Sequence, residues 1–266
     1  MEILVCIKQV PDDAVKVCFD KNTGSPDISG ITPVVNAFDT YALEMAARFK
    51  EANEGNITVL SIGDEKSKDA IRNCLSVGAD KGFLVCDEIF SDIGTFATAT
   101  VLKAAISKIE ETLGSKFDII FCGRESTDFS SGVVGAQLAE TMGLNMVSDI
   151  IAVSSKGRGL SVKQETEEGY NIIEIGTPCL FTVTKPDYDP RYPTMKSKIA
   201  ARKADIPVFS ASDLKISAAD FKNMNSIKII DIYPLKTREA GIKIKEKDAA
   251  EAVKKAVEIM LKAGVL

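Results

Sequence analysis

The chain has 266 residues, of which 45% are hydrophobic and 27% are charged, and its formal net charge is −5. This composition is ordinary for a folded globular protein and excludes a disordered or collagen-like chain. The negative charge argues against nucleic-acid binding, and the absence of histidine excludes Ser-His-Asp sites, Cys-His sites and histidine-ligated metal centres.

The cysteines and the N-terminus indicate where the protein resides. The six cysteines include no C-x-x-C pair, and most lie in apolar, strand-like runs. They are typical of buried thiols in a reducing compartment, so we expect neither a disulfide framework nor a metal site. The first residues, MEILVCIKQVPDD, lack the basic leader of a signal peptide, and no window approaches about 18 consecutive apolar residues. We expect a cytoplasmic protein without membrane insertion.

Buried strands rich in Ile and Val alternate with amphipathic helices over the first part of the chain. The strand-like runs are Glu2–Val10, Asn56–Gly63, Gly82–Asp87 and Phe117–Gly123, and the predicted helices are Ala37–Ala52, Glu65–Ala79 and Thr95–Gly114. This alternation predicts a doubly wound α/β unit whose parallel sheet is covered on both faces. The segment Val15–Val35 contains an Asn-Thr-Gly-Ser-Pro turn, which predicts a hairpin excursion before the first helix.

The pattern changes after Gly143. Residues Met146–Thr184 alternate polar and apolar side chains around a Lys-Gly-Arg-Gly turn, which predicts antiparallel strands. The acidic run Glu165–Tyr170 falls at a second hairpin turn, where we expect solvent exposure. The segment Lys185–Ala204 combines prolines and tyrosines with a basic helix. Locally, a solvated charged face and an arm that docks a partner explain this segment equally well.

The C-terminal segment, residues 205–266, is predicted to contain a strand and a strong helix. The strand is expected over Ser226–Tyr233 and the helix over Glu246–Gly264. The apolar face of this helix consists of Ala249, Ala252, Val253, Ala256, Val257 and Met260. Such a face must pack on something.

The connection after the strand Phe117–Gly123 carries the strongest functional signal, CGRESTDFSSGVVGAQLAE. It lies at the carboxyl end of a predicted parallel strand, where open sheets bind ligands. Small residues allow close backbone approach, hydroxyls donate hydrogen bonds, and a helix beginning near Ser131 would offer free N–H groups to an anion. We expect a phosphate or pyrophosphate here, although a good helix start alone also explains Ser-Ser-Gly. The spacing of Gly123, Gly132 and Gly135 fits neither a Walker A loop nor G-x-G-x-x-G.

Asn36 and Asp39 stand at the entry of the first predicted helix. Locally, a plain N-cap followed by an acid in the first turn explains both residues best. The alternative is that the amide and the carboxylate contact a ribose or a base.

Five ordered motifs make the chain resemble the beta (small) subunit of electron-transfer flavoproteins. They are VCIKQVPD, VNAFDTYALEMAARFKE, CGRESTD with SGVVG, VKQETEEGYNIIEIGTPCLFTVT and DPRYPTMKSKIAARK, spread over Met1 to about Lys203. The resemblance implies a Rossmann-like, doubly wound, mostly parallel α/β sheet of the adenine-nucleotide-binding type, with an antiparallel hairpin and a C-terminal arm ending in a helix. It also implies a nucleotide- or flavin-binding domain over 1–204, including a partner-recognition loop at about 185–204, and an extension over 205–266 whose helix packs on the alpha subunit.

The resemblance also implies a function. The alpha subunit of the heterodimer carries FAD; members that only shuttle electrons keep AMP in the beta site, whereas electron-bifurcating members bind a second FAD there. We expect the bifurcating branch, in which NADH gives a hydride and electrons pass to ferredoxin and, through the alpha-subunit FAD, to a flavin dehydrogenase. An FAD-dependent lactate dehydrogenase and an acyl-CoA dehydrogenase are both compatible. The alternatives are a non-bifurcating subunit with structural AMP and, more remotely, a non-redox adenine-nucleotide sensor resembling universal stress proteins.

Site residues follow from the resemblance by position. The implied nucleotide contacts are Cys6, Ile7, Lys8, Asn36, Ala37, Phe38, Asp39, Ser61, Ile62, Cys122, Gly123, Arg124, Glu125, Ser126, Thr127, Asp128, Ser130, Ser131, Gly132, Val133 and Val134. The implied partner-docking residues are Arg191, Tyr192 and Met195, with Met195 at the position of the family's apolar anchor. Neither a catalytic residue nor a metal ligand is expected, because the flavin supplies the redox chemistry.

The chain departs from the family pattern at several of these positions. Ala37 replaces proline, Ser130 replaces an acid, Met195 replaces leucine, and Val133 stands where many relatives have glutamine. Valine cannot donate a side-chain hydrogen bond to phosphate. Backbone N–H groups and Ser131 are therefore expected to hold the anion.

Overall fold

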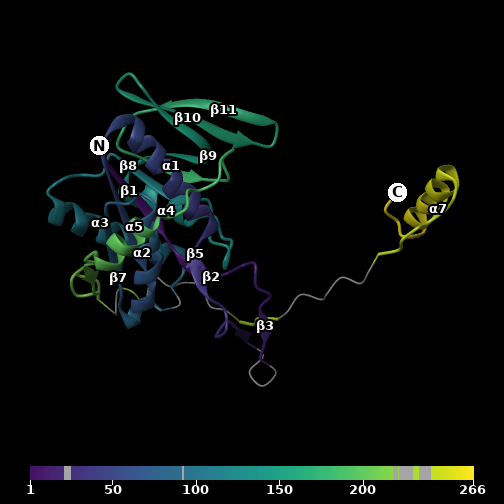
Figure 1. Cartoon of the computed structure of the whole chain (residues 1–266), viewed down its shortest axis with the longest axis horizontal. Coiled ribbons are helices and arrows are strands. Elements are labelled where there is room, and N and C mark those ends of the chain that lie inside the picture. The colour runs from purple at the N-terminus through teal and green to yellow at the C-terminus, as the bar shows by residue number, and fades with distance from the viewer. Residues whose placement is uncertain (21–24, 92, 218–220, 222–229, 234–240) are drawn as a thin grey trace. The chain divides into compact units, whose positions relative to one another are not determined.

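The computed structural model describes residues 1–20, 25–91, 93–217, 221, 230–233 and 241–266 (Figure 1). It divides into two compact units, one of residues 1–18 and 26–229 and the other of residues 19–25 and 230–266. The strand β13 (Val208–Phe209) pairs with a strand of the sheet in the first unit. The domain boundary expected after Ala204 stays a prediction.

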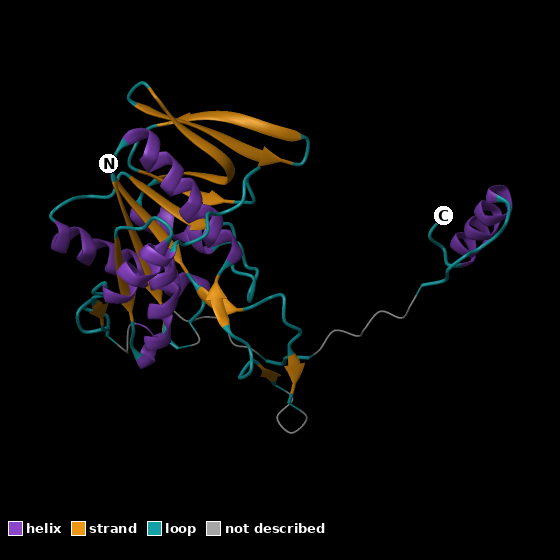
Figure 2. Ribbon diagram, in the orientation of Figure 1, coloured by secondary structure: helices purple, strands orange, loops and turns teal. Residues whose placement is uncertain are grey.

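A nine-stranded sheet with the order β11-β10-β9-β12-β8-β1-β6-β7-β13 forms the centre of the first unit. The strands are β1 Glu2–Ile7, β6 Asn56–Ile62, β7 Lys81–Val85, β8 Ile119–Gly123, β9 Asn145–Lys156, β10 Gly159–Thr166, β11 Gly169–Ile175, β12 Cys179–Val183 and β13. All neighbours from β9 to β13 pair in parallel, whereas β10 pairs antiparallel with β9 and β11. The predicted doubly wound, mostly parallel sheet with an antiparallel hairpin is confirmed (Figure 2).

Helices cover both faces of this sheet. They are α1 Ala37–Asn53, α2 Lys68–Ser76, α3 Thr95–Leu113, α4 Val134–Met142 and α5 Met195–Lys203, with short 3-10 turns at Glu65–Ser67 and Glu88–Phe90. Met45 of α1 and Ile71 of α2 join the apolar core on one face, while Ile106 of α3 and Leu138 of α4 join the core on the other. The strands read as continuous apolar runs because both of their faces are buried. No helix in the described part of the chain is long and apolar enough to span a membrane.

Several predicted segments differ in detail from the structure. The two ends of the predicted hairpin excursion pair with one another, β2 (Gln9–Pro11) antiparallel with β5 (Pro33–Val35). The two-residue strands β3 (Cys18–Phe19) and β4 (Pro26–Asp27) lie between them in sequence. The predicted Asn-Thr-Gly-Ser-Pro turn falls largely on residues 21–24, which lie outside the described residues. The antiparallel prediction for Met146–Thr184 is wrong for its last strand, β12, which returns to the sheet parallel to both β9 and β8.

The second unit contains the helix α7, Ala249–Lys262, as predicted. The Asp248 side chain caps it by accepting a hydrogen bond from the Ala250 N–H at 3.1 Å. No residue of α7 is buried in the described structure. The strand expected over Ser226–Tyr233 is absent from residues 230–233, and residues 226–229 lie outside the described residues.

Candidate functional site

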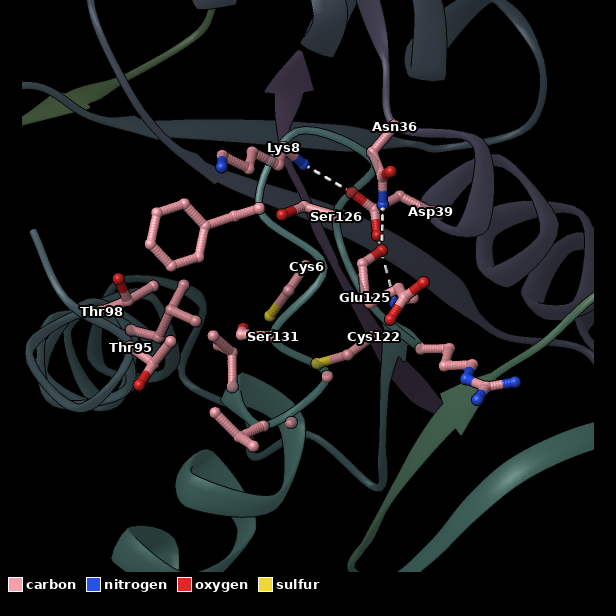
Figure 3. Close-up of a pocket in the computed structure, with 18 of the residues that line it drawn as sticks. Cys6, Lys8, Asn36, Asp39, Thr95, Thr98, Cys122, Glu125, Ser126 and Ser131 are labelled. Atoms are coloured by element: carbon pink, nitrogen blue, oxygen red, sulfur yellow. Dashed lines mark hydrogen bonds between the residues drawn. The ribbon is translucent and has the colours of Figure 1, made fainter. Parts of the chain in front are cut away.

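The strand order reverses between β1 and β8. The chain leaves β1 for β6 on one side and later returns to β8 on the other, and Cys6 of β1 is the register partner of Cys122 of β8. Open parallel sheets bind ligands beyond the carboxyl ends of their strands at such a point. A cavity of about 210 Å³ lies here (Figure 3).

Most of the predicted nucleotide contacts line this cavity. They are Cys6, Ile7, Lys8, Asn36, Asp39, Ile62, Cys122, Gly123, Arg124, Glu125, Ser126, Ser131, Gly132, Val133 and Val134. The other predicted contacts, Ala37, Phe38, Ser61, Thr127, Asp128 and Ser130, do not belong to its wall. Residues from four separate parts of the sequence are therefore brought together as the strand-end argument requires.

One wall of the cavity was not predicted from the sequence. It is formed by Ile93, Thr95, Thr98 and Leu102, and the lining also includes Phe129 and Gly135. Thr95 and Thr98 lie on α3, across the cavity from Asn36 and Glu125 (Figure 3). The sequence feature that could have predicted this wall is the pair of threonines, three residues apart, in the first turn of an apolar helix.

Asn36 fixes the loop that follows β8. Its Nδ2 donates to the Glu125 carbonyl at 2.8 Å, and its Oδ1 accepts from the Thr127 N–H at 3.0 Å. Asn36 does occupy the N-cap position of α1, as predicted, but its side chain makes no capping hydrogen bond to the helix. A buried amide that satisfies both a donor and an acceptor of one loop holds that loop in a single conformation.

Asp39 ties the ends of β1 and β8 to the first turn of α1. Its carboxylate accepts from the Lys8 N–H at 2.7 Å and from the Gly123 N–H at 3.1 Å. Burial raises the pKa of Asp39 to about 7, although the hydrogen bonds it receives act in the opposite direction. A Cβ at position 123 would lie 2.8 Å from Phe38 Cβ and 2.9 Å from the Asp39 nitrogen, so glycine is needed there.

The start of α4 supplies an anion cradle. The helix begins at Val134, three residues later than predicted, and no side chain caps its first N–H groups. The Ser-Ser-Gly stretch therefore does not start the helix but lies before it, with Gly132 at a φ of +66°. A Cβ at Gly135 would lie 2.5 Å from Thr182 Cγ2, so this glycine lets the helix start approach β12. Free N–H groups at such a start attract a phosphate.

Hydroxyl groups and cations complete the donor set. Within the described residues, the Ser126 and Ser131 hydroxyls donate no hydrogen bond, and both residues line the cavity (Figure 3). Lys8 Nζ pairs with Asp128 at 2.7 Å, and Arg124 Nε pairs with Asp149 at 3.4 Å. Because such partly exposed pairs are weak, either cation can exchange its carboxylate for a bound phosphate. The donors present fit the phosphate groups of a nucleotide.

Two cysteine thiols, of Cys6 and Cys122, line the cavity. Cys6 and Cys122 are buried and face one another (Figure 3). The hydrogen bond with the Cys6 thiol and burial hold the pKa of Cys122 well above its ordinary value. A thiol that stays protonated is a poor nucleophile, so Cys122 acts as a small apolar side chain here.

The predicted docking residues differ in their environments: Arg191 is ion-paired within the protein, whereas Tyr192 and Met195 are exposed. Arg191 lies against α1, where its Nε donates to buried Glu44 at 2.7 Å and its guanidinium also pairs with Glu51 at 2.5 Å. Tyr192 and Met195 project into solvent, with 92% and 75% of their surface exposed. Burial acts to raise the pKa of Glu44, but the hydrogen bonds from Arg191 and Arg48 outweigh it and hold the pKa below its ordinary value. Arg191 therefore anchors the segment, and its neighbours are left exposed.

Met195 is the first residue of α5. The Thr194 Oγ accepts from the Ser197 N–H at 3.1 Å, and the Ser197 hydroxyl in turn accepts from the Thr194 N–H at 3.0 Å, which makes a capping box. This cap fixes where the helix starts. Met195 and Ile199, 75% and 52% exposed, consequently share one outward side, four residues apart.

Comparison with known proteins identifies the family. The model of the electron transfer flavoprotein domain matches residues 29–214. The chain is 36% identical over 260 residues to the electron transfer flavoprotein subunit beta of Thermoanaerobacterium thermosaccharolyticum, covering 97% of each chain. It is 35% identical to the subunit beta of Megasphaera elsdenii, covering 94% of each, and 33% identical to the caffeyl-CoA reductase-Etf complex subunit CarD of Acetobacterium woodii, covering 82% of this chain and 81% of that one. The chain belongs to the electron transfer flavoprotein family, among its beta subunits.

Proposed function

We propose that this chain is the beta subunit of an electron-bifurcating flavoprotein and binds FAD in the cavity between β1 and β8. The observation that supports the proposal is the cavity itself, at the reversal of strand order, where the uncapped start of α4 meets free hydroxyls and two cations. A dinucleotide needs such a cradle for its pyrophosphate. The reaction would take a hydride from NADH and deliver one electron to ferredoxin and the other to the alpha-subunit FAD.

The residues around the cavity would have different roles in binding the nucleotide. The first N–H groups of α4 and the Ser131 hydroxyl would hold the phosphates, with Lys8 and Arg124 balancing their charge. When bound, the flavin supplies the hydride and electron chemistry. Asn36 and Asp39 do not need to touch it, because they hold the loop and the strand ends that form the cradle.

The proposed partners are an alpha subunit that carries FAD and a flavin dehydrogenase or acyl-CoA reductase. The name of the Acetobacterium woodii relative, a subunit of a caffeyl-CoA reductase-Etf complex, supports a reductase of this class. Tyr192 and Met195 would dock on that enzyme, since both are exposed at the start of α5. The apolar face of α7, including Val253 and Val257, would pack on the alpha subunit as part of an extension over 205–266.

A non-bifurcating subunit with AMP is the second candidate, because the same cradle holds one phosphate as well as two. The visible spectrum and nucleotide content of the copurified heterodimer separate the two. Two flavins per heterodimer, both reduced by NADH, are the expected result. One flavin with one AMP would leave the family assignment intact and contradict bifurcation, while a flavin-free homodimer that binds ATP would indicate a non-redox sensor.

A further inference from the structure

Phe129 is an exposed aromatic side chain on the wall of the cavity. It keeps 54% of its surface accessible, which is unusual for phenylalanine, and it is the only aromatic residue among the described residues that line the cavity. The hydrogen-bonding role proposed for the loop leaves this ring unused. An apolar ring of this size held at the mouth of a binding cavity calls for a flat, apolar partner.

The backbone holds Phe129 firmly in place. Its N–H donates to the Ser126 carbonyl at 3.3 Å, and the next N–H, of Ser130, donates to the same carbonyl at 2.7 Å. Ser130 adopts a left-handed φ of 47°, which turns the chain sharply after the ring. Asn36 fixes the residues just before this turn. The backbone from which the ring projects is therefore held in place by hydrogen bonds within the protein.

The surroundings of Phe129 match the ring portion of a nucleotide. The unpredicted wall of the cavity contributes the apolar residues Ile93 and Leu102, and Ile62 adds to them from the end of β6. The cradle that suits phosphate, at Ser131 and Gly132, follows Phe129 within three residues of the chain. The cavity thus joins an anion-binding part to an apolar part that contains one aromatic face.

We propose that Phe129 stacks on the heteroaromatic ring of the nucleotide bound in this cavity, whether adenine or isoalloxazine. The inference rests on the proposed nucleotide function and deepens it, because it assigns a residue to the ring and not to the phosphates. Stacking needs no particular hydrogen-bonding edge, so the contact serves any base or flavin with a π face. The Phe129 ring contributes affinity and position and takes no part in electron transfer.

The absence of tryptophan from the chain provides a direct test. In the full chain stripped of nucleotide, Phe129→Trp introduces a single indole at the proposed contact. Phe96→Trp is the matched control, because Phe96 is 47% exposed on α3 and does not line the cavity. Titration with AMP, which does not absorb the indole emission, is expected to quench the fluorescence of Phe129→Trp and leave that of Phe96→Trp unchanged. Ribose 5-phosphate, which has no aromatic ring, is expected to quench neither.

A second variant measures the energetic effect by calorimetry. Phe129→Gly is expected to bind AMP and FAD about tenfold more weakly than the natural chain, in the range of base–aromatic stacking, and to bind ribose 5-phosphate equally well. If AMP leaves the fluorescence of Phe129→Trp unquenched, and AMP and FAD bind Phe129→Gly with unchanged affinity, the stacking role is overturned while the proposed nucleotide function stands.

Two further outcomes are distinguishable from these. Failure of the natural chain to bind either nucleotide would overturn the proposed function and this inference together. Quenching of the Phe129→Trp fluorescence by added alpha subunit alone would assign position 129 to the subunit interface and overturn the stacking proposal.

Discussion

Two loops of this protein are fastened to the same helix by different chemistry. The cavity loop, residues 124–133, and the strand ends beside it are held at the start of α1 by the amide of Asn36 and the buried carboxyl of Asp39. The docking segment, residues 185–194, is held further along α1 by the ion pairs of Arg191 with Glu44 and Glu51. Helix α1 is thus the common support of the cavity and of the exposed docking side chains.

The difference follows from what each loop must do. Around the cavity, backbone groups are buried and need complete hydrogen bonding, which the neutral amide of Asn36 and the buried carboxyl of Asp39 supply. The docking segment lies at the surface, where a guanidinium between two carboxylates positions the backbone and leaves the neighbouring Tyr192 and Met195 free. Substitutions at the two supports are expected to have separable effects on stability.

Asp39→Ala is expected to have the largest effect. It leaves the N–H groups of Lys8 and Gly123 without their acceptor in a buried place, which costs about 2–4 kcal/mol of unfolding free energy. Urea unfolding measures this loss, and nucleotide binding is expected to fall with it. Asp69→Ala is the control, since that aspartate is 77% exposed on α2. Equal stabilities of the two variants would show that Asp39 does not stabilise the strand ends beside the cavity.

Arg191→Ala is expected to cost about 2 kcal/mol, because Glu44 stays buried and retains only Arg48 as an ionic partner. The difference from the natural protein should shrink in high salt, whereas the Asp39 effect should not. Unfolding at two salt concentrations checks this, with Arg158→Ala in an exposed turn as control. Nucleotide affinity that falls as much as in Asp39→Ala would contradict the separation of the two supports.

The pH dependence of stability should have opposite signs for the two carboxyls. Asp39 has a folded-state pKa raised to about 7 from 3.8, so the folded protein keeps a proton that the unfolded chain releases. Stability is therefore lost as the pH rises through this window, by up to about 1.4 kcal/mol per pH unit. The pKa of Glu44 is lowered from 4.5, so its contribution is lost as the pH falls below that value.

Urea unfolding between pH 3 and 8 tests both signs. Asp39→Asn should remove the decline between about pH 4 and 7, and Glu44→Gln should reduce the loss in acid. If Asp39→Asn declines as the natural protein does, the carboxyl of Asp39 is ionised in the folded state at neutral pH and the cavity is more polar than described.

Met195→Ala is expected to change stability least, by less than about 0.5 kcal/mol, because the side chain is 75% exposed. Binding of the heterodimer to its dehydrogenase should nevertheless weaken, since Met195 is proposed to be the apolar anchor. Surface plasmon resonance with the partner measures this. Ile28→Ala, at an exposed position before β5, is the control. A large loss of stability with unchanged docking would show that Met195 supports the fold and is not the docking anchor.

The fold was largely predictable because its sheet is buried on both sides. The apolar runs of β1, β6, β7 and β8 and the periodicity of α1 and α3 reflect that burial directly. The parallel return of β12 was missed, because pairing direction depends on where the chain re-enters the sheet and not on local alternation. The boundary at Ala204 and the cofactor contacts stay predictions.

The site was predictable only where its residues adjoin strand ends. Ser131 and Gly132 follow β8 and were found, whereas Thr95 and Leu102 reach the cavity only through the packing of α3. The role of Asn36 was misjudged for the same reason, since its hydrogen-bond partners lie 89 and 91 residues away in the sequence. Local propensity favours a side-chain cap at such a position. In the folded protein, the Asn36 amide instead makes hydrogen bonds to the loop after β8.

The most direct test of the cavity as the nucleotide site is the nucleotide content of the purified heterodimer carrying Gly132→Val. Gly132 has a φ of +66° and open space around it, so valine there would distort the cradle without a clash in the core. Gly157→Val is the matched control, because Gly157 has a φ of +60°, has no atom within 4 Å of an added Cβ, and lies in the β9–β10 turn. Loss of one nucleotide per heterodimer in Gly132→Val alone, with the alpha-subunit flavin retained, is the predicted result. Full nucleotide content in Gly132→Val would contradict the account.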